Sequence, residues 1–120
     1  MKQITSDERR VANIYEAEFK PFYGEHGPDT GETILQINEE RKLGVGFHVY
    51  RMAPGTTTIP HAHTNHEEFL VLEGELVDND GYVYRKGDLV WLKKGTQHSS
   101  HSKSGALLAV FIQSPEANLE

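Results

Sequence analysis

Five of the seven histidines in the chain lie between residues 61 and 101, and their spacing could hold a metal ion. On a β-strand, residues two apart point to the same face, so His61 and His63 would present two imidazole rings side by side. A carboxylate from Glu67 or Glu68 would follow after a short turn. It would offset the charge of a divalent ion and fill a further coordination position.

A third imidazole, from His98, follows about thirty residues later at the start of another predicted strand. A ligand from a distant strand is what the interior of a barrel would supply. Together His61, His63, Glu67 and His98 would bind a metal through three neutral imidazoles and one carboxylate. In an octahedral ion this set leaves two positions open for water, substrate or dioxygen.

The other four histidines have simpler interpretations. We expect His26 and His48 to be surface or hydrogen-bonded core residues rather than ligands. We place His66 in the turn before the predicted strand that begins at Glu67. His101 is three residues past His98 and so lies on the opposite face of its strand. Either His66 or His101 could line the mouth of a pocket.

Composition narrows the remaining chemistry. The 120 residues contain no cysteine, which excludes disulfides, thiol nucleophiles and cysteine-based metal sites. There are 12 Lys plus Arg against 18 Asp plus Glu, a net charge of −6, which disfavours a nucleic-acid partner. No apolar run is long enough to span a membrane. Residues 1–10 are too charged for a signal peptide, so we expect a cytoplasmic protein.

The elements that must position these residues are short strands. Residues 1–31 are predicted to be an irregular segment, with a short helix over 7–18 or a dimer arm. Residues 32–114 alternate with period two and are punctuated by Gly and Pro, which predicts one all-β barrel or jelly roll. Residues 115–120 would form a tail. The predicted strands are Thr33–Asn38, Leu43–Met52, Ile59–His63, Glu67–Leu72, Glu75–Val77, Tyr82–Arg85, Leu89–Leu92, His98–Ser102 and Ala106–Ile112.

Alternation also predicts which side chains face inward. On the strand after the first histidines, Glu67, Phe69 and Val71 would face the interior and Glu68 the outside. On the strand over 43–52 one alternate set faces inward, and Tyr50 or Arg51, if inward, could orient an anionic substrate. Trp91 and Phe111 are predicted to be core aromatics.

Two stretches resemble the conserved motifs of the cupin superfamily. Gly55-x5-His61-x-His63-x3-Glu67-x6-Gly74 is similar to the first motif at every fixed position. Gly87-x5-Lys93-x-Gly95-x2-His98-x3-Ser102 is similar to the second, with Lys93 where the family usually has proline and Ser102 where it often has asparagine. The resemblance covers roughly residues 40–112.

The resemblance implies a small cupin-type β-barrel with His61, His63, Glu67 and His98 as metal ligands. The spacing to Gly74 selects Glu67 over Glu68. One divalent ion per chain is implied, and Fe(II), Mn(II), Ni(II) and Zn(II) remain open. Small cupins commonly form dimers, so a homodimer is also implied, and the N-terminal 40 residues could pair across its interface.

Three functions remain open for such a site. The first is an enzyme acting on a small organic molecule, in the manner of a dioxygenase that binds an enolate or diketone together with O2. The second is an isomerase or lyase with a redox-silent metal, which needs a proton-transfer residue that the sequence does not single out. Cupin-type dimethylsulfoniopropionate lyases carry a tyrosine where Phe69 stands, which argues against that activity.

The third is a non-catalytic metal or ligand sensor. The run Glu67–Leu76, followed by Asp80-Gly81 and Gly87-Asp88, is similar to the cupin domains of zinc-binding anti-sigma factors. Those regulators join the cupin to a helical sigma-binding domain. Only about 31 residues precede the predicted barrel here, so we expect a stand-alone enzyme or binding protein rather than a regulator.

Overall fold

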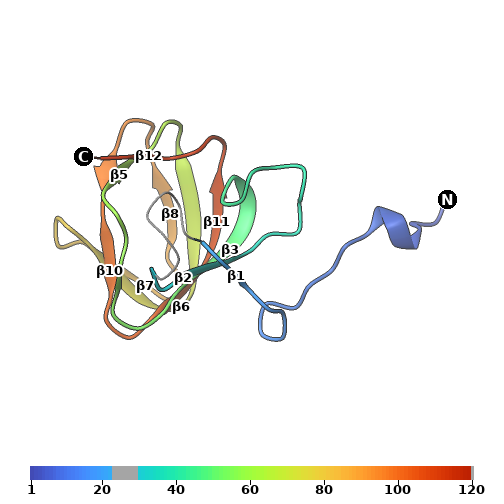
Figure 1. Cartoon of the computed structure of the whole chain (residues 1–120), viewed down its shortest axis with the longest axis horizontal. Helices are drawn as coiled ribbons and strands as arrows, with labels where there is room; N and C mark the ends of the chain where they lie inside the picture. The colour runs from blue at the N-terminus through green and yellow to red at the C-terminus, as the bar shows by residue number, and fades with distance from the viewer. Residues whose placement is uncertain (23–29, 120) are drawn as a thin grey trace.

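The computed structural model of the chain describes residues 1–22 and 30–119, and nearly all of its regular structure is β-strand (Figure 1). The prediction of an all-β fold is therefore confirmed. In chain order the elements are η1 (Ser6–Glu8), β1 (Lys20–Pro21), β2 (Glu32–Leu35), β3 (Gly46–Met52), β4 (Thr56–Thr57), β5 (His61–Ala62), β6 (Glu67–Asp78), β7 (Val83–Arg85), β8 (Leu89–Leu92), β9 (Gln97–His98), β10 (Ser100–Ser102), β11 (Ala106–Ile112) and β12 (Ala117–Asn118).

Within the described residues the strands form two hydrogen-bonded sheets that curl around one interior (Figure 1). The larger sheet runs β1-β2-β3-β11-β6-β10-β4, and β7 and β8 also pair with β6. The smaller sheet runs β12-β5-β9. All the pairings are antiparallel, as expected for a barrel or jelly roll in which one face of each strand is covered.

Strand β6 is the longest element and connects different parts of the barrel. Its first half pairs with β11 and β8, and its second half pairs with β7 and β10. The register against β11 shifts near Gly74, which has a φ of +75°. A Cβ at Gly74 would lie 2.1 Å from the carbonyl oxygen of Gly105, so only glycine fits there. The sequence predicted two strands here, because Glu73-Gly74 looks like a turn.

The core lies on the inward face of the same strands. Phe69 and Val71 are buried as alternation predicted, and Glu67 is buried while Glu68 is exposed. Phe69 and Val71 pack in one cluster whose other members are Met52, Leu76, Tyr84, Ala106, Leu108, Val110 and Ile112. The inward direction of β6 was therefore predicted correctly.

Trp91 corrects one expectation. It is 59% exposed rather than buried, although it lies on β8 next to the start of β6. Trp91 pairs in register with Glu68, the exposed member of its own strand, so both side chains lie on the outer face. Alternation places a residue on one side of a strand but does not say which side the rest of the chain covers.

The segment before the barrel is extended rather than helical. Of the short helix that was one alternative for residues 7–18, the structure has the three-residue turn η1 at Ser6–Glu8 and a single further turn in which the Ala17 amide donates to the carbonyl of Asn13. Figure 1 shows this segment, blue, reaching away from the barrel before β1 pairs with β2. Nearly all its residues are exposed, including Val11 and Tyr15. No helix among the described residues is long and apolar enough to cross a membrane.

Candidate metal centre

The structure brings three of the sequence-predicted ligands together at the smaller sheet. His61 and His98 are paired in register on β5 and β9, and His63 follows directly after β5. The centroids of the three rings lie 4.6 to 5.3 Å apart. One ligand nitrogen from each of these histidines falls within 4.8 Å of the other two. Residues 37 positions apart therefore form one cluster, because two strands distant in sequence are neighbours in the barrel.

Each imidazole is held through its Nδ1 atom. His61 Nδ1 donates to the carbonyl oxygen of Ile59 at 2.7 Å. His63 Nδ1 lies 2.8 Å from Thr96 Oγ1. Because the Thr96 hydroxyl already donates its proton to the carbonyl of Lys93, it must accept from His63. Nδ1 is thus the protonated nitrogen of His61 and His63, which leaves the lone pair of each Nε2 free.

His98 is held by a buried carboxylate. Its Nδ1 lies 3.0 Å from Asp78 Oδ2, which also accepts from the Tyr84 hydroxyl at 2.6 Å. The other oxygen of Asp78 accepts from the Ser100 hydroxyl at 2.6 Å. Burial alone would raise the pKa of Asp78, but the hydrogen bonds from His98, Ser100 and Tyr84 outweigh it, so this pKa is lowered. Burial would likewise lower the pKa of His98, but Asp78 raises it.

Glu67 completes the predicted set from the start of β6. Its Oε1 lies 3.4 Å from Nε2 of His63, and the side chain is buried, as alternation along the strand predicted. The exposed Glu68 instead lies 3.7 Å from Nε2 of His66, outside the cluster. The four predicted residues therefore converge on one region of the barrel.

Glu116 is a second carboxylate at this site that the sequence did not indicate. It precedes β12, which pairs with β5 and so carries Glu116 over the histidines. Its two oxygens lie 3.5 Å from His61 Nε2 and 3.8 Å from His63 Nε2. The only signal was its acidic type in the predicted tail.

The two carboxyl groups influence each other strongly. Burial and the adjacent charge of Glu67 raise the pKa of Glu116 to about 9. Burial would also raise the pKa of Glu67, but the neighbouring imidazoles of His63 and His98 outweigh it, so this pKa is lowered. The two groups titrate as a pair, because ionising one carboxyl disfavours ionising the other.

The remaining candidate residues lie elsewhere. His101 is exposed, and its Nδ1 lies 2.7 Å from Thr57 Oγ1. His66 stacks on Trp91 at a centroid distance of 6.5 Å. His48 is buried, and its Nδ1 donates to the carbonyl of Gly46, as expected for a hydrogen-bonded core histidine. His26 lies outside the described residues.

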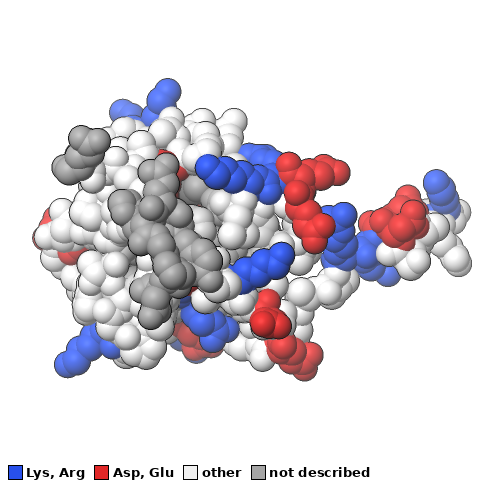
Figure 2. All heavy atoms as spheres, in the orientation of Figure 1, with Lys and Arg blue, Asp and Glu red and all other residues white. Residues whose placement is uncertain are grey.

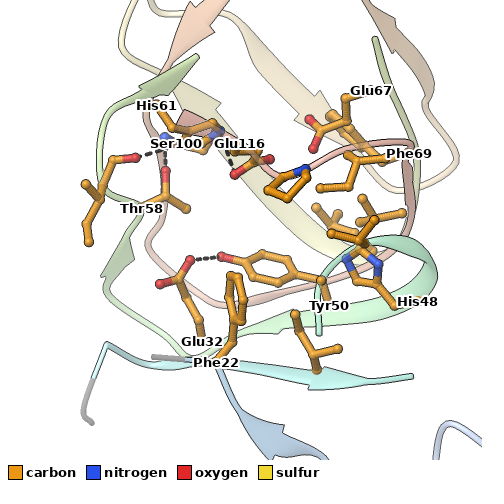
Figure 3. Close-up of a pocket in the computed structure, with 18 of the residues that line it drawn as sticks. Phe22, Glu32, His48, Tyr50, Thr58, His61, Glu67, Phe69, Ser100 and Glu116 are labelled. Carbon is orange, nitrogen blue, oxygen red and sulfur yellow. Dashed lines mark hydrogen bonds and ion pairs between the residues drawn. The ribbon is translucent and has the colours of Figure 1, made fainter. Parts of the chain in front are cut away.

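A cavity of about 630 Å³ opens beside the histidines (Figure 3). His61, His98 and Glu67 line one part of it, and Tyr50 and Glu32 line another. Tyr50 therefore faces inward, whereas the neighbouring Arg51 is exposed and its guanidinium lies 4.6 Å from the centre of the Phe19 ring. Most of the other lining residues are apolar, including Phe22, Ile34, Met52, Phe69, Leu76, Leu108, Val110 and Ile112.

The donor set fits a divalent metal ion. His63 Nε2 is buried and has no hydrogen-bond partner among the described residues, although a buried nitrogen normally has one. A metal at the centre of the three Nε2 atoms would satisfy it. His61, His63 and His98 form one candidate group, and His63, Glu67 and Glu116 form a second that overlaps it. Imidazole and carboxylate donors suit Zn, Fe, Mn and Ni.

The curled antiparallel sheets, with imidazoles and a carboxylate facing a pocket inside them, define a small barrel of the cupin class. The chain belongs to the family described as the ChrR Cupin-like domain, whose model matches residues 8–115. The match covers every strand but β12, and most of the segment before the barrel. The cupin resemblance predicted from the two motifs is therefore confirmed.

Solved structures with the same fold have diverse functions. An acetylacetone dioxygenase from Acinetobacter johnsonii superposes with a TM-score of 0.73, 16% identity, and coverage of 100% of this chain and 83% of that one. The polyketide cyclase RemF from Streptomyces resistomycificus superposes with a TM-score of 0.69 and 18% identity, and the alignment covers 93% of this chain and 86% of that one. The anti-sigma ChrR in complex with SigE, from Rhodobacter sphaeroides, superposes with a TM-score of 0.63 and 14% identity, and the alignment covers 82% of this chain and 49% of that one. At these identities the similarity shows the fold alone.

Curated relatives match over only part of their length. The small ribosomal subunit protein uS4 of Laribacter hongkongensis is 29% identical over 110 residues, covering 89% of this chain and 52% of that protein. The chain thus spans about half the length of the curated relatives it matches.

Proposed function

We propose that the chain is a metal-dependent enzyme that acts on a small organic molecule, with dioxygenase-like chemistry as the leading reaction. The carrying observation is the convergence of three imidazoles whose Nδ1 atoms are all hydrogen-bonded, with one ligand nitrogen of each within 4.8 Å of the others, beside a largely apolar cavity. His61, His63, His98 and Glu67 would hold one divalent ion per chain. Fe(II) and Mn(II) suit dioxygen chemistry, and Ni(II) and Zn(II) suit the same donors.

When bound, the metal would supply Lewis acidity and, if redox-active, a site for dioxygen. The chain's own residues orient the metal ligands and exclude water. The hydrogen bonds to Ile59, Thr96 and Asp78 orient the imidazoles and set their tautomer. The apolar wall made by residues such as Phe69 and Val110 excludes water from the reacting molecule.

Similarity of fold supports this reaction class. The barrel superposes on an acetylacetone dioxygenase over the whole chain. An enolisable carbonyl compound is therefore our first choice of substrate class. The fold by itself does not decide the chemistry, so the proposal depends on the site.

A redox-silent isomerase, lyase or cyclase is the second candidate, and Glu116 favours it. This class needs a group that moves a proton near the metal, and the sequence offered none. Glu116 lies 3.5 Å from His61 Nε2 and 3.8 Å from His63 Nε2, so it places a second carboxyl group within reach of a ligand bound at the metal. The similarity of fold to a polyketide cyclase agrees with such a role.

A non-catalytic metal or ligand sensor is the third candidate, supported by the match to the ChrR Cupin-like domain family.

The similarity to uS4 covers about half of that protein, and we do not propose a ribosomal role from it. The net charge is −6, and on the face in Figure 2 basic and acidic side chains are interspersed rather than gathered into one basic patch.

Metal analysis and oxygen uptake separate these candidates. The protein is purified without added metal, its bound metals are measured, and oxygen consumption is followed against enolisable diketones and aromatic ketones. Iron or manganese at about one ion per chain with substrate-dependent oxygen uptake supports the dioxygenase. Bound zinc with turnover but no oxygen uptake supports the isomerase or lyase. Zinc with neither activity supports the sensor and contradicts an enzyme.

We also propose a homodimer, with the outer face of β3, β6, β8 and β11 as its interface. Phe47, Leu89 and Trp91 are exposed there, and an apolar sheet face of this kind is a common site of association. The extended arm carries further exposed apolar side chains at Val11 and Tyr15. A Trp91→Glu variant should be a monomer by light scattering at a concentration where the wild type is a dimer, with His101→Glu as control. Wild-type protein that is monomeric throughout contradicts this proposal.

A further inference from the structure

The pocket contains a second polar group that the proposed metal chemistry does not use. Glu32 on β2 and Tyr50 on β3 both line it, and the Tyr50 hydroxyl donates to Glu32 Oε1 at 2.5 Å. Figure 3 shows this pair in a different part of the pocket from His61 and Glu67. Side chains around it are apolar, including Phe22 and Ile34.

Placing Glu32 and Tyr50 among apolar side chains costs desolvation free energy. Burial raises the pKa of Glu32, although hydrogen bonds from Tyr50 and Thr30 act in the opposite direction. Burial also raises the pKa of Tyr50, as do the charge and hydrogen bond of Glu32. A half-buried carboxyl group and phenol carry a desolvation cost that an apolar pair of similar shape would not.

The pair also has unused hydrogen-bonding capacity. A carboxylate offers about four lone-pair sites, of which the Tyr50 hydroxyl occupies one. The phenol oxygen donates its only proton to Glu32 and keeps its own lone pairs. At the cavity wall the pair therefore presents acceptors, and a ligand must bring the donor.

We propose that Glu32 and Tyr50 form a recognition site for a hydrogen-bond donor, a hydroxyl or a protonated amine, on a ligand whose other end reaches the histidines. The assignment of that other end rests on the proposed function. The site is separate from the metal ligands and acts in binding rather than in the chemical step.

The charge of the pocket restricts the ligand further. Carboxyl groups line it at Glu32, Glu67 and Glu116, and Lys42, which is exposed, is the one Lys or Arg among its described lining residues. Arg51, which might have bound an anion, faces away. At the end lined by Glu32, away from the proposed metal ligands, the pocket therefore favours neutral or cationic groups over carboxylates.

The volume of the cavity sets the size of the ligand. At about 630 Å³ it lies in the range of pockets that enclose drug-sized molecules. A substrate of a few carbon atoms would leave most of the apolar wall uncovered. We therefore expect an apolar body, such as an aromatic ring, between the donor and the metal-binding group.

Binding of a matched probe series tests the site. The probes are 1-phenylbutane-1,3-dione and its derivatives carrying a meta or para hydroxyl, aminomethyl or carboxylate group. Dissociation constants are measured by calorimetry on metal-free and on zinc-loaded wild-type protein. At least one hydroxyl or aminomethyl probe should bind about tenfold more tightly than the parent, and the carboxylates about tenfold more weakly.

Two conservative variants then test whether Glu32 and Tyr50 cause the preference for donor-bearing probes. Glu32→Gln removes the charge and Tyr50→Phe removes the phenol oxygen with little change of shape. Each should reduce the preference for the donor to below about threefold, and Glu32→Gln should also relieve the exclusion of carboxylates. The controls Glu75→Gln and Tyr82→Phe alter exposed residues of the same types and should leave every ratio unchanged. Circular dichroism checks that each variant is folded.

The outcomes separate this inference from the proposed function. Wild-type protein that binds every probe equally, or binds none in either form, overturns the inference, and so does an equal loss of preference in the controls. A donor preference in protein that binds no metal would leave the recognition site standing while the metal-dependent enzyme fails. Metal binding and oxygen uptake without a donor preference would support the metal-dependent enzyme and overturn the recognition site.

Discussion

The two faces of the sheet formed by β3, β11, β6 and β8 have unexpected polarity. The inner face carries Glu67, His48 and Tyr50 beside core residues such as Val71. The outer face carries Phe47, Leu89 and Trp91, all exposed. The face turned to the pocket thus holds buried ionisable groups, and the face turned to solvent holds large apolar side chains.

The difference shows that polarity alone does not identify the inside of this barrel. Inner polar groups are tolerated because almost every one has a hydrogen-bond partner, as Tyr50 has in Glu32 and His48 in the carbonyl of Gly46. Outer apolar groups lie in register across strands, where Phe47 pairs with Phe111. We interpret the inner face as a ligand site and the outer face as a surface for association.

The largest expected difference between inner and outer residues concerns metal binding. Replacing His98 by Ala should abolish stoichiometric metal binding, because it removes one of the three converging imidazoles. Replacing His101 by Ala should leave one ion per chain, because that side chain is exposed and bonds Thr57. Elemental analysis of both purified variants measures the result. Equal metal contents in the two variants would contradict the assigned site.

The second-largest expected difference between inner and outer residues concerns the free energy of unfolding. Met52 is 1% exposed and packs in the core cluster, so Met52→Ala should lower the free energy of unfolding by about 2–5 kcal/mol. Leu89 is 80% exposed, so Leu89→Ala should change it by less than about 0.5 kcal/mol in the monomer. Urea unfolding of metal-free protein at low concentration gives both values. A large loss at Leu89 would mean that the outer face is covered within one chain.

A smaller effect should come from the residue that supports His98. Asp78→Asn should weaken metal affinity by about 10- to 100-fold, because it removes the charged acceptor that orients the His98 ring while leaving the Nε2 ligand in place. Competition with a chelator measures the affinity. Asp7→Asn, in the exposed arm, is the control and should change nothing. An unchanged affinity in the Asp78 variant would show that His98 is held by packing alone.

The smallest effect concerns pH and the buried inner histidine. Burial lowers the pKa of His48 below its usual 6.5 in the folded state, although the bond to Gly46 and the charge of Glu67 oppose this. Below pH 6.5 the unfolded chain therefore binds a proton that the folded chain resists, and stability is lost as the pH falls toward the folded-state pKa. Metal-free His48→Gln should lose less stability between pH 7.5 and 5.5 than the wild type in urea unfolding. An equal loss would mean that His48 does not titrate differently on folding.

Sequence reasoning succeeded where local pattern and structure coincide. Strands β8 at Leu89–Leu92 and β11 at Ala106–Ile112 have the predicted bounds, because each is an apolar run that follows a glycine-containing turn. The Asn79-Asp80-Gly81 turn is present, with Gly81 at a φ of +90°. It failed where contacts decide, as at residues 7–18, where a helix-like pattern has no surface to pack against.

The amino-acid sequence by itself determined the class of fold and which histidines could act together. Period-two alternation requires strands, and the spacing of His61, His63 and Glu67 allows their side chains to converge only on a strand and its following turn. Only the tertiary structure brought Glu116 over the histidines and paired Glu32 with Tyr50. It also left Trp91 outside. These depend on which strands become neighbours, and long-range pairing leaves no periodic signal in the chain.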